Sequence, residues 1–283
     1  MIKLYNDDCF NILSSIDDNS VDLILCDLPY GTTDRHGVSK TKNGSRMLKW
    51  DNVLDLDKLW NEYKRIINKT HGVIVLTADQ PFTSQLVLSN IEWFKYEWIW
   101  KKGKATGFLL ANYRPMKLTE DILIFSPVGA SPSAKKNNNC MTFNPQNLIE
   151  KKIIKKNNPK RLGKFLNQPE FMGKNNKLLG VTEYQQNYTN YPTEIIEFNL
   201  DGKHTHPTQK PIALMEYLIK TYSNENYLVL DNCMGSGTTG CACKKLNRNF
   251  IGIELDTEFY KIAKDRIDNT EILIEGKGEK FFE

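Results

Sequence analysis

Short apolar runs alternate with stretches of helical period along most of this chain. Runs rich in β-branched residues occupy 2–5, 21–26 and 72–77, and the stretches 9–16 and 56–67 have apolar side chains at helical spacing. Strands that alternate with helices are typical of a mostly parallel sheet with helices on both faces. The sequence therefore predicts an α/β fold. Further strands are predicted at 94–100, 120–125, 227–231 and 250–255. Four further helices are predicted: one begins at Pro81, one begins at Pro211, one ends at Leu246 and one spans 259–267.

A change in composition divides this α/β pattern. Between Ser131 and Gly180 there are eleven Lys or Arg and two Glu, a local balance of +9, whereas the net charge of all 283 residues is only +4. Clusters of Lys, Asn and Pro replace the hydrophobic period there. We therefore predict an inserted segment, with the chain divided into residues 1–126, 127–203 and 204–283.

Nothing in the sequence indicates a membrane segment or a metal centre. No stretch approaches the roughly 18 apolar residues of a transmembrane helix, and the first residues contain no apolar run of signal-peptide length. The six cysteines form no CxxC pair, and His204 and His206 have no third or fourth metal ligand spaced nearby. We predict a cytoplasmic protein with buried free thiols and no metal.

A glycine-rich turn follows the strand that ends at Asp231. Residues 235–240, GSGTTG, satisfy GxGxxG, in which glycines let the backbone approach a ligand and the next helix presents free N–H groups. Glu254 ends the next strand, where an acid can bind ribose hydroxyls. A nicotinamide-dependent oxidoreductase is therefore an open alternative, although only about fifty residues follow the turn, too few for the second half of a dinucleotide domain. Cys241 replaces the lysine of a P-loop.

Another strand, at 21–26, continues into the sequence DLPY at 27–30. An acid and a proline after a strand can form an ordinary turn. They can also hold a carboxylate and an aromatic ring at the edge of the sheet, where ligands of open α/β sheets bind. Both interpretations are open from this stretch alone.

Three stretches together resemble motifs of the DNA amino-methyltransferases. DLPY resembles their D/N/S-P-P-Y/F motif, and DNCMGSGTT at 231–239 resembles their DPFxGSGTT loop for S-adenosylmethionine. HPTQKP at 206–211 is a third match. The order, with the catalytic motif first, the basic insertion next and the cofactor loop last, is that of the family's β group. The resemblance covers nearly the whole chain apart from the insertion.

The resemblance implies a circularly permuted Rossmann-like methyltransferase fold, in which the strands that carry Asp27 and Asp231 are neighbours. Residues 1–126 and 204–283 would be the two parts of the catalytic domain, and 127–203 the target-recognition region. The implied enzyme is a site-specific DNA methyltransferase that transfers a methyl group from S-adenosylmethionine to N6 of a flipped-out adenine in double-stranded DNA.

Two other functions are open. Methylation of N4 of cytosine is the first, but the family's cytosine members more often begin the motif with Ser, so Asp27 favours adenine. The second is a non-catalytic nucleic-acid-binding module that retains the fold. Leu28, which replaces the family's second-position proline, would help to explain it.

The catalytic residues that the resemblance implies are Asp27, Leu28, Pro29 and Tyr30. The exocyclic amino nitrogen of a base is a poor nucleophile because its lone pair is delocalised into the ring. A carboxylate accepting one N–H, and the main-chain carbonyl of Leu28 or Pro29 accepting the other, would stabilise the positive charge that develops on this nitrogen. Tyr30 would stack on the flipped base. Without the fixed φ of a proline, the loop geometry at Leu28 depends more on packing.

The resemblance also implies a set of residues that bind the cofactor. Asp8 would meet its adenosine end, Glu254 its ribose, and Thr208 and Lys210 its methionine part. Asp8 is alternatively a helix N-cap, and Lys210 a solvated charge. The full set is Asp8, Cys9, Phe10, Asp27, Thr208, Lys210, Asp231, Met234, Gly235, Ser236, Gly237, Thr238, Thr239, Glu254 and Leu255.

Two basic segments are the predicted DNA contacts. The loop 34–52 follows the catalytic motif, and the insertion 127–203 interleaves lysines with Asn, Gln and aromatic residues. A disordered basic linker is the alternative for the insertion. The family includes dimers and enzymes that accompany a restriction endonuclease, so both partners are open. The predicted DNA-binding residues are Arg35, Lys40, Lys42, Arg46, Lys49, Lys151, Lys152, Lys155, Lys156, Lys160 and Arg161.

Overall fold

The computed structural model describes residues 1–31, 53–156, 183–201 and 209–272. They belong to two compact units, one from 1–144 with 194–283 and the other from 145–193. The second unit lies within the predicted insertion and contains a two-stranded antiparallel sheet of β6 (Ile149–Lys156) and β7 (Glu183–Thr189). All other described helices and strands belong to the first unit, including the short helix α4 (Pro132–Lys136).

Eight described strands of the first unit form one sheet. All neighbours pair in parallel except β5, which is antiparallel to both of its neighbours. The predicted α/β fold with a mostly parallel sheet is confirmed. The strand that ends at Asp27 pairs with the strand that ends at Asp231, so the predicted neighbourhood of these two carboxylates is also confirmed. The strand order is β1 (Ile2–Tyr5), β10 (Asn249–Ile253), β9 (Leu228–Asp231), β2 (Leu23–Asp27), β3 (Val73–Ala78), β5 (Lys117–Phe125), β4 (Phe94–Thr106) and β8 (Ile195–Phe198).

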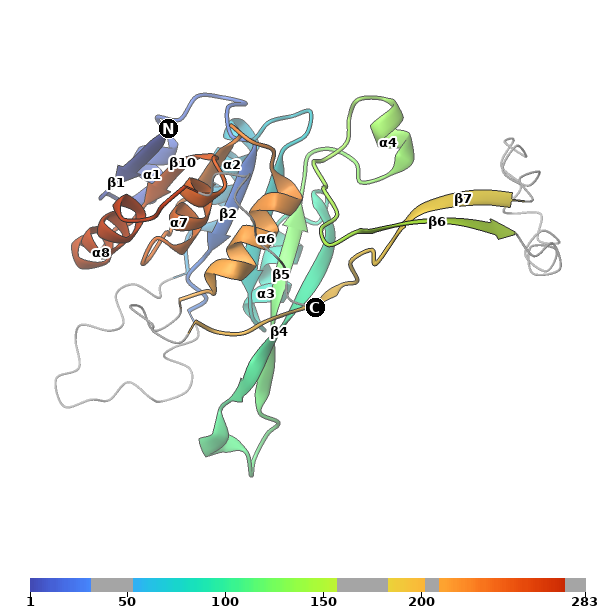
Figure 1. The fold of residues 1–283 in the computed structure, drawn as a ribbon. Helices are drawn as coiled ribbons and strands as arrows, with labels where there is room; N and C mark the ends of the chain where they lie inside the picture. Colours follow the sequence, from blue (N-terminus) through green and yellow to red (C-terminus); the bar gives the residue numbers. More distant parts are fainter. Residues whose placement is uncertain (32–52, 157–182, 202–208, 273–283) are drawn as a thin grey trace. The chain divides into compact units, whose positions relative to one another are not determined.

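Helices cover both faces of this sheet (Figure 1). Side chains alternate along β2, so Leu23 and Leu25 belong to the hydrophobic core on one face, and Ile24 and Cys26 to the core on the other. Because both faces are buried, the strand has a continuous apolar sequence. The first core is covered by α6 (Ile212–Tyr222), α7 (Thr238–Lys245) and α8 (Thr257–Asp268), and the second by α1 (Cys9–Leu13), α2 (Leu56–Ile66) and α3 (Phe82–Ser89).

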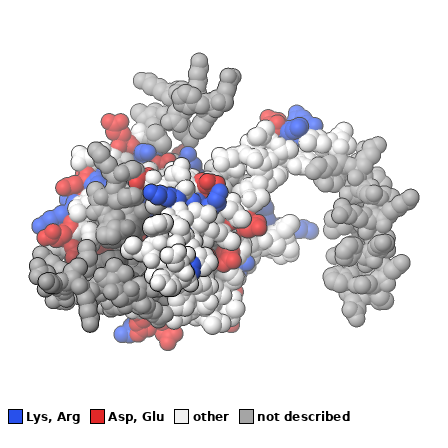
Figure 2. Space-filling view, turned by 90° about the horizontal axis from the view of Figure 1, so that it is seen from below, with Lys and Arg blue, Asp and Glu red and all other residues white. Residues whose placement is uncertain are grey.

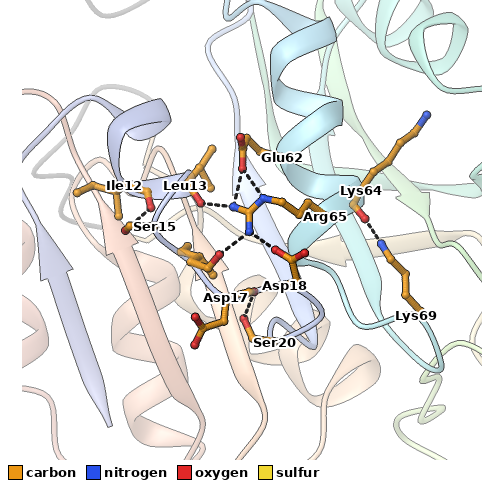
Figure 3. Close-up of polar contacts among 11 residues, drawn as sticks. Ile12, Leu13, Ser15, Asp17, Asp18, Ser20, Glu62, Lys64, Arg65 and Lys69 are labelled. Atoms are coloured by element: carbon orange, nitrogen blue, oxygen red, sulfur yellow. Dashed lines mark hydrogen bonds and ion pairs between the residues drawn. The ribbon is translucent and has the colours of Figure 1, made fainter.

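Arg65 of α2 fastens the C-terminal end of α1 (Figure 3). Its guanidinium donates hydrogen bonds to the carbonyl oxygens of Leu13 (2.8 Å) and Ile16 (2.6 Å), and it pairs with the carboxylates of Glu62 and Asp18. The last carbonyls of a helix have no partner within it and carry partial negative charge, so a cation there is stabilising. α1 ends earlier than the predicted helix at 9–16, because the residues after Leu13 turn toward α2.

β4 and β5 continue beyond the sheet as a long hairpin (Figure 1). The predicted strand stopped at Trp100, but pairing continues as Lys101↔Thr119 and Thr106↔Lys117, and a 3-10 turn, η2 (Phe108–Leu110), follows β4. Most side chains of the extension are exposed. Sequence analysis missed it because an exposed hairpin needs no hydrophobic period.

Candidate functional site

The carboxyl ends of four neighbouring strands bring the predicted residues together. In the order β1, β10, β9, β2, these ends are followed by Asp8, Glu254, the turn after Asp231, and the motif that begins at Asp27. Three strands therefore carry most of the predicted cofactor residues side by side, and the fourth carries the catalytic motif. Residues that are far apart in the sequence share one edge of the sheet, where ligands of open α/β sheets bind.

The glycine-rich turn is held by backbone contacts. The N–H of Met234 donates to the carbonyl of Ile253 (3.0 Å), and the N–H of Gly237 donates to the carbonyl of Met234 (2.8 Å). Gly235 and Gly237 have φ of +51° and +79°, which favours glycine. A Cβ on Gly237 would lie 2.9 Å from the Cβ of Ala263, whereas a Cβ on Gly235 would meet no described atom within 4 Å. The turn is thus packed on one side and open at Gly235.

Buried side chains on either side of the glycine-rich turn hold it in place. Asp231 is buried and accepts a hydrogen bond from the N–H of Cys233 (3.2 Å), and burial raises the pKa of its carboxyl to about 6. Asn232, where the family has proline, accepts a 2.5 Å hydrogen bond from the hydroxyl of Tyr63 on α2. Thr238 and Thr239, the first residues of α7, are also buried. These side chains support the turn rather than face an open space.

Glu254 supports the turn and remains partly available. One carboxylate oxygen accepts from the N–H of Gly235 (2.8 Å) and the other from the N–H of Asp256 (2.9 Å). Burial raises the pKa of this carboxyl to about 7, although the two backbone donors oppose the shift. A carboxylate oxygen can accept more than one hydrogen bond, and Glu254 is 9% exposed, so its remaining acceptor positions suit only a ligand that lies directly against the turn.

The residues beside Glu254 form a mixed surface. Leu255 is 65% exposed, Phe10 is half-buried, and Asp8 is exposed. Asp8 is the N-cap of α1, as the alternative interpretation held, because it accepts from the N–H of Phe10 (2.8 Å). The Cys9 side chain is buried in the core, which leaves only its backbone for a ligand. Exposed apolar groups beside acceptors suit a nucleoside, which has a flat ring and hydroxyl donors.

The carboxylate of Asp27 is contacted on both oxygens. Oδ1 accepts hydrogen bonds from the hydroxyls of Tyr30 (2.7 Å) and Thr77, and Oδ2 lies 2.6 Å from Nζ of Lys210. The Tyr30 ring stacks on Phe82 with centroids 5.6 Å apart. Tyr30 therefore orients the carboxylate, a role that sequence analysis did not predict.

Leu28 is held by packing. Its side chain is only 2% exposed and belongs to the same core as α2 and α3. A buried side chain restricts the backbone around it, which replaces part of the restraint of the family's proline. Packing of Leu28 in the core therefore holds the loop at the catalytic motif. The sequence analysis predicted this dependence on packing for a loop without the proline.

Lys210 is not a solvated charge. Its side chain is 8% exposed, it pairs with Asp27 and with Glu120 (3.5 Å) of β5, and its Nζ lies 5.6 Å from the centroid of the Tyr30 ring. Burial alone would lower the pKa of this ammonium, but the two carboxylates raise it above its ordinary value. Sequence analysis missed Glu120, for which an acid at the start of a predicted strand was the only signal.

Glu120 also pairs with Lys102 of β4. Burial would raise the pKa of this carboxyl, but the ammonium groups of Lys210 and Lys102 lower it below its ordinary value. Asp27, Lys210, Glu120 and Lys102 therefore form a neutral, mostly buried chain of alternating charges. We call it the Asp27 charge chain.

Comparisons with known proteins agree with this arrangement. A family model described as DNA methylase (N6_N4_Mtase) matches residues 21–265. The chain belongs to this DNA methylase family. It is 27% identical to "Type II methyltransferase M.HpaI" of Haemophilus parainfluenzae over 272 residues, which cover 94% of this chain and 74% of that protein. It is 27% identical to "DNA adenine methyltransferase YhdJ" of Escherichia coli (strain K12) over 261 residues, 90% and 79% of the two chains.

Solved structures share the fold of this DNA methylase. The M1.HpyAVI complex with SAM is 26% identical, has a TM-score of 0.57 and covers 94% of this chain and 100% of that chain. The PvuII DNA methyltransferase (cytosine-N4-specific) has a TM-score of 0.60 over 94% and 86% of the chains. Its sequence identity is 14%, so this second likeness concerns the fold alone.

Most predicted DNA-binding residues of this DNA methylase lie outside the described residues, as does Thr208. On the face drawn in Figure 2, basic and acidic groups are interspersed around a largely uncharged area. The predicted DNA-binding residues that lie outside the described residues are Arg35, Lys40, Lys42, Arg46, Lys49, Lys160 and Arg161. Those on β6 are Lys151, Lys152, Lys155 and Lys156, of which the first two are exposed.

The tip of the β4–β5 hairpin is a surface that sequence analysis missed. Phe108, Leu109 and Tyr113 are 78%, 92% and 86% exposed, and Lys104 and Arg114 are exposed beside them. Clustered exposed apolar side chains on a DNA methylase usually mark a contact surface. The hairpin leaves the sheet beyond Lys102, the last residue of β4 that pairs with β8 and a member of the Asp27 charge chain.

Further findings concern metal sites, membrane-spanning helices and the cysteines. Among the described residues, no three His, Cys, Asp or Glu side chains come together as metal ligands. No helix in the described part of the DNA methylase is long and apolar enough to span a bilayer. All six cysteines are free thiols, four of them buried.

Proposed function

We propose that this DNA methylase transfers a methyl group from S-adenosylmethionine to N6 of a flipped-out adenine at a specific site in double-stranded DNA. The position of Asp27 carries the proposal: this acceptor ends the strand next to the one that leads into the glycine-rich turn. The name of the Escherichia coli relative supports adenine as the base. Asp27 itself also favours adenine, because cytosine members of the family more often have Ser here.

The residues at the sheet edge fit S-adenosylmethionine. Gly235 leaves its side of the turn open, Glu254 can accept from ribose hydroxyls, and Leu255 and Phe10 offer apolar surface to the adenine ring. When bound, the cofactor supplies a methyl group activated by a positively charged sulfur. The turn and Glu254 would hold its nucleoside end, and β2, the neighbour of β9 in the sheet, would bring Asp27 beside it.

Asp27 makes the target nitrogen a better nucleophile. Its carboxylate accepts one N–H of the amino group, and the carbonyl of Leu28 or Pro29 accepts the other, which favours tetrahedral nitrogen and stabilises the developing positive charge. With S-adenosylmethionine bound, the nitrogen would form a bond to the methyl carbon, the electrons of the broken carbon–sulfur bond would remain on sulfur, and one N–H proton would pass from the nitrogen to water. Holding the two reactants in line supplies much of the remaining acceleration.

Long-read modification sequencing tests the proposal. DNA from a methylation-deficient host that expresses the chain should carry N6-methyladenine in one short sequence motif, and DNA from a host that expresses Asp27→Ala should not. N4-methylcytosine in place of N6-methyladenine would overturn the base assignment. No modification by a folded protein that binds S-adenosylmethionine would favour the non-catalytic module instead.

Cofactor affinity is expected to rise with pH through about 7. Below the raised pKa of Glu254, about 7, the carboxyl is protonated and loses an acceptor for ribose hydroxyls, so affinity falls as pH falls. Titration calorimetry with S-adenosylmethionine across this pH range measures the effect. Glu254→Gln should bind more weakly, with a flatter pH profile. The variant retains Asp231, whose pKa is about 6, so an unchanged slope would assign the titration to that residue.

The hairpin tip is proposed to contact DNA. Arg114 is exposed and would pair with a phosphate, so Arg114→Ala should weaken DNA binding and reduce the slope of log affinity against log salt by about one. Fluorescence anisotropy over a salt series measures both. Lys264→Ala, which removes an exposed cation of α8, is the matched control. Equal salt slopes for Arg114→Ala and the wild-type protein would remove the tip from the DNA contact.

The remaining partners and the location of the protein stay predictions. DNA is the substrate of the family to which the chain belongs, whereas a homodimer, a cognate restriction endonuclease and a cytoplasmic location are tested by nothing in the structure. The predicted DNA-binding residues of the loop 34–52 and of the insertion also stay predictions, and we propose that they add phosphate contacts to those of the hairpin tip.

A further inference from the structure

The Lys210 ammonium lies between two carboxylates at unequal distances. It is 2.6 Å from Oδ2 of Asp27 and 3.5 Å from Oε2 of Glu120. Among the described residues, Oε2 of Glu120 is a buried oxygen without a well-placed hydrogen-bond donor: Lys102 donates to the other oxygen, and Lys210 forms only the 3.5 Å ion pair. Buried acceptors are rarely left without a donor. Glu120 therefore offers Lys210 a second carboxylate that the ammonium does not fully engage in the position observed.

In the position observed, Lys210 blocks two things that the target base needs. It occupies Oδ2, the oxygen of Asp27 that receives no hydroxyl, since both Tyr30 and Thr77 donate to Oδ1. Its Nζ also lies over the Tyr30 ring, on which the base would stack. The Lys210 ammonium therefore occupies the position that the target amino group would take at Asp27, and it covers part of the Tyr30 ring.

We propose that Lys210 is a positioning residue that holds Asp27 while no base is bound and moves to Glu120 when the target base enters. This inference rests on the proposed methyl transfer at Asp27. The movement frees Oδ2 for an N–H of the amino group and clears the Tyr30 ring. It also gives Oε2 of Glu120 its missing donor, so the cation is never buried without a carboxylate partner.

Glu120 is what makes the exchange feasible. A base can displace Lys210 only by as much free energy as it gains at Asp27, because a ligand shifts an equilibrium through its difference in affinity for two states. Moving a buried ammonium away from its only carboxylate would cost more than an amino group gains there. With Glu120 close by, one ion pair is exchanged for another of the same charge.

The variant Glu120→Gln tests this exchange. It keeps the size of the side chain and a partner for Lys102, but removes the charge that receives Lys210. We expect the single-turnover methylation rate to fall about 10- to 100-fold, as for loss of one charge-assisted hydrogen bond. S-adenosylmethionine affinity should not change. With 2-aminopurine placed beside the target adenine, the fluorescence rise that reports unstacking around the flipped adenine should be smaller at equal DNA saturation.

A second substitution separates positioning from support of the fold. In Glu120→Gln with Lys210→Met, no cation remains to occupy Asp27, so the 2-aminopurine signal should return toward that of the wild-type protein and methylation should be faster than in Glu120→Gln. If Glu120 only stabilised the fold, the second change would add to the first defect. Glu120→Asp, which keeps the charge one methylene farther away, should give a smaller defect than Glu120→Gln.

The matched control is Glu197→Gln, which breaks the exposed Lys101–Glu197 pair (3.0 Å) on the neighbouring strands without touching Lys210. It should leave both rate and signal unchanged. Equal signals for Glu120→Gln and wild-type protein, or a double variant no better than Glu120→Gln, would overturn the inference. A wild-type protein that gives the 2-aminopurine signal but makes no N6-methyladenine would instead overturn the proposed function.

Discussion

Replacing Asp27 with Ala is expected to lower the single-turnover methylation rate by about 10²- to 10³-fold, or about 3–4 kcal/mol of transition-state stabilisation. The carboxylate is the acceptor that would stabilise positive charge on the amino nitrogen. It is already held by the Tyr30 and Thr77 hydroxyls, so it needs little reorganisation during the reaction. Rapid-quench measurement with saturating S-adenosylmethionine and a duplex containing the modified motif gives the rate.

Asp27→Asn is the matched variant for this experiment. It keeps one acceptor oxygen, and the family motif accepts Asn at this position, so its loss of rate should be smaller than that of Asp27→Ala. In both variants the loss of rate should exceed any loss of affinity for the cofactor or for DNA, because Asp27 adds most of its stabilisation in the transition state. A wild-type rate in Asp27→Ala would mean that another group accepts the amino proton.

The two glycines of the cofactor turn are expected to respond differently to alanine. Gly237→Ala should lower the free energy of unfolding by about 2–4 kcal/mol, because a left-handed φ costs about 1–2 kcal/mol and the new Cβ would also overlap Ala263. Gly235→Ala should cost only the left-handed conformation, about 1–2 kcal/mol. Its Cβ projects into open space on the side proposed for the cofactor.

Binding and stability measured together distinguish these two effects. We expect Gly235→Ala to weaken S-adenosylmethionine binding at least about tenfold, or 1.4 kcal/mol, while the protein stays folded. Gly237→Ala should lose stability first, as urea denaturation would show. If Gly235→Ala bound the cofactor as well as the wild-type protein, the open side of the turn would not be the cofactor site.

The strand-end carboxylates could be predicted because they follow a regular pattern. Each of Asp27, Asp231 and Glu254 comes directly after an apolar run, and parallel strands bring such ends to one edge of the sheet. The helices and strands that surround them have strong hydrophobic periods. The observed strands therefore agree with the predicted ones where a strand is buried on both faces, because such burial requires an apolar residue at nearly every position.

The polar partners of Asp27 could not be predicted in the same way. Lys210 is 183 residues away, and its neighbourhood in the sequence suggested the cofactor or solvent. Glu120 lies in a strand whose antiparallel pairing with β3 brings it to the site. No periodic pattern marks a buried charge that is stabilised by another charge far away in the chain. The exposed hairpin escaped prediction for the opposite reason, since most of its side chains are exposed.

The strand order also determines when the enzyme can first work during its own synthesis. β2, β3, β4 and β5 come from one continuous stretch and can pair early, but β1 and β2 wait for β10 and β9, more than 200 residues later. Such distant pairings form slowly because a long chain segment must be closed into a loop first. A growing chain on the ribosome therefore carries its complete catalytic motif long before it has a cofactor turn, and it stays inactive until the turn at 235–240 and strand β10 have been made.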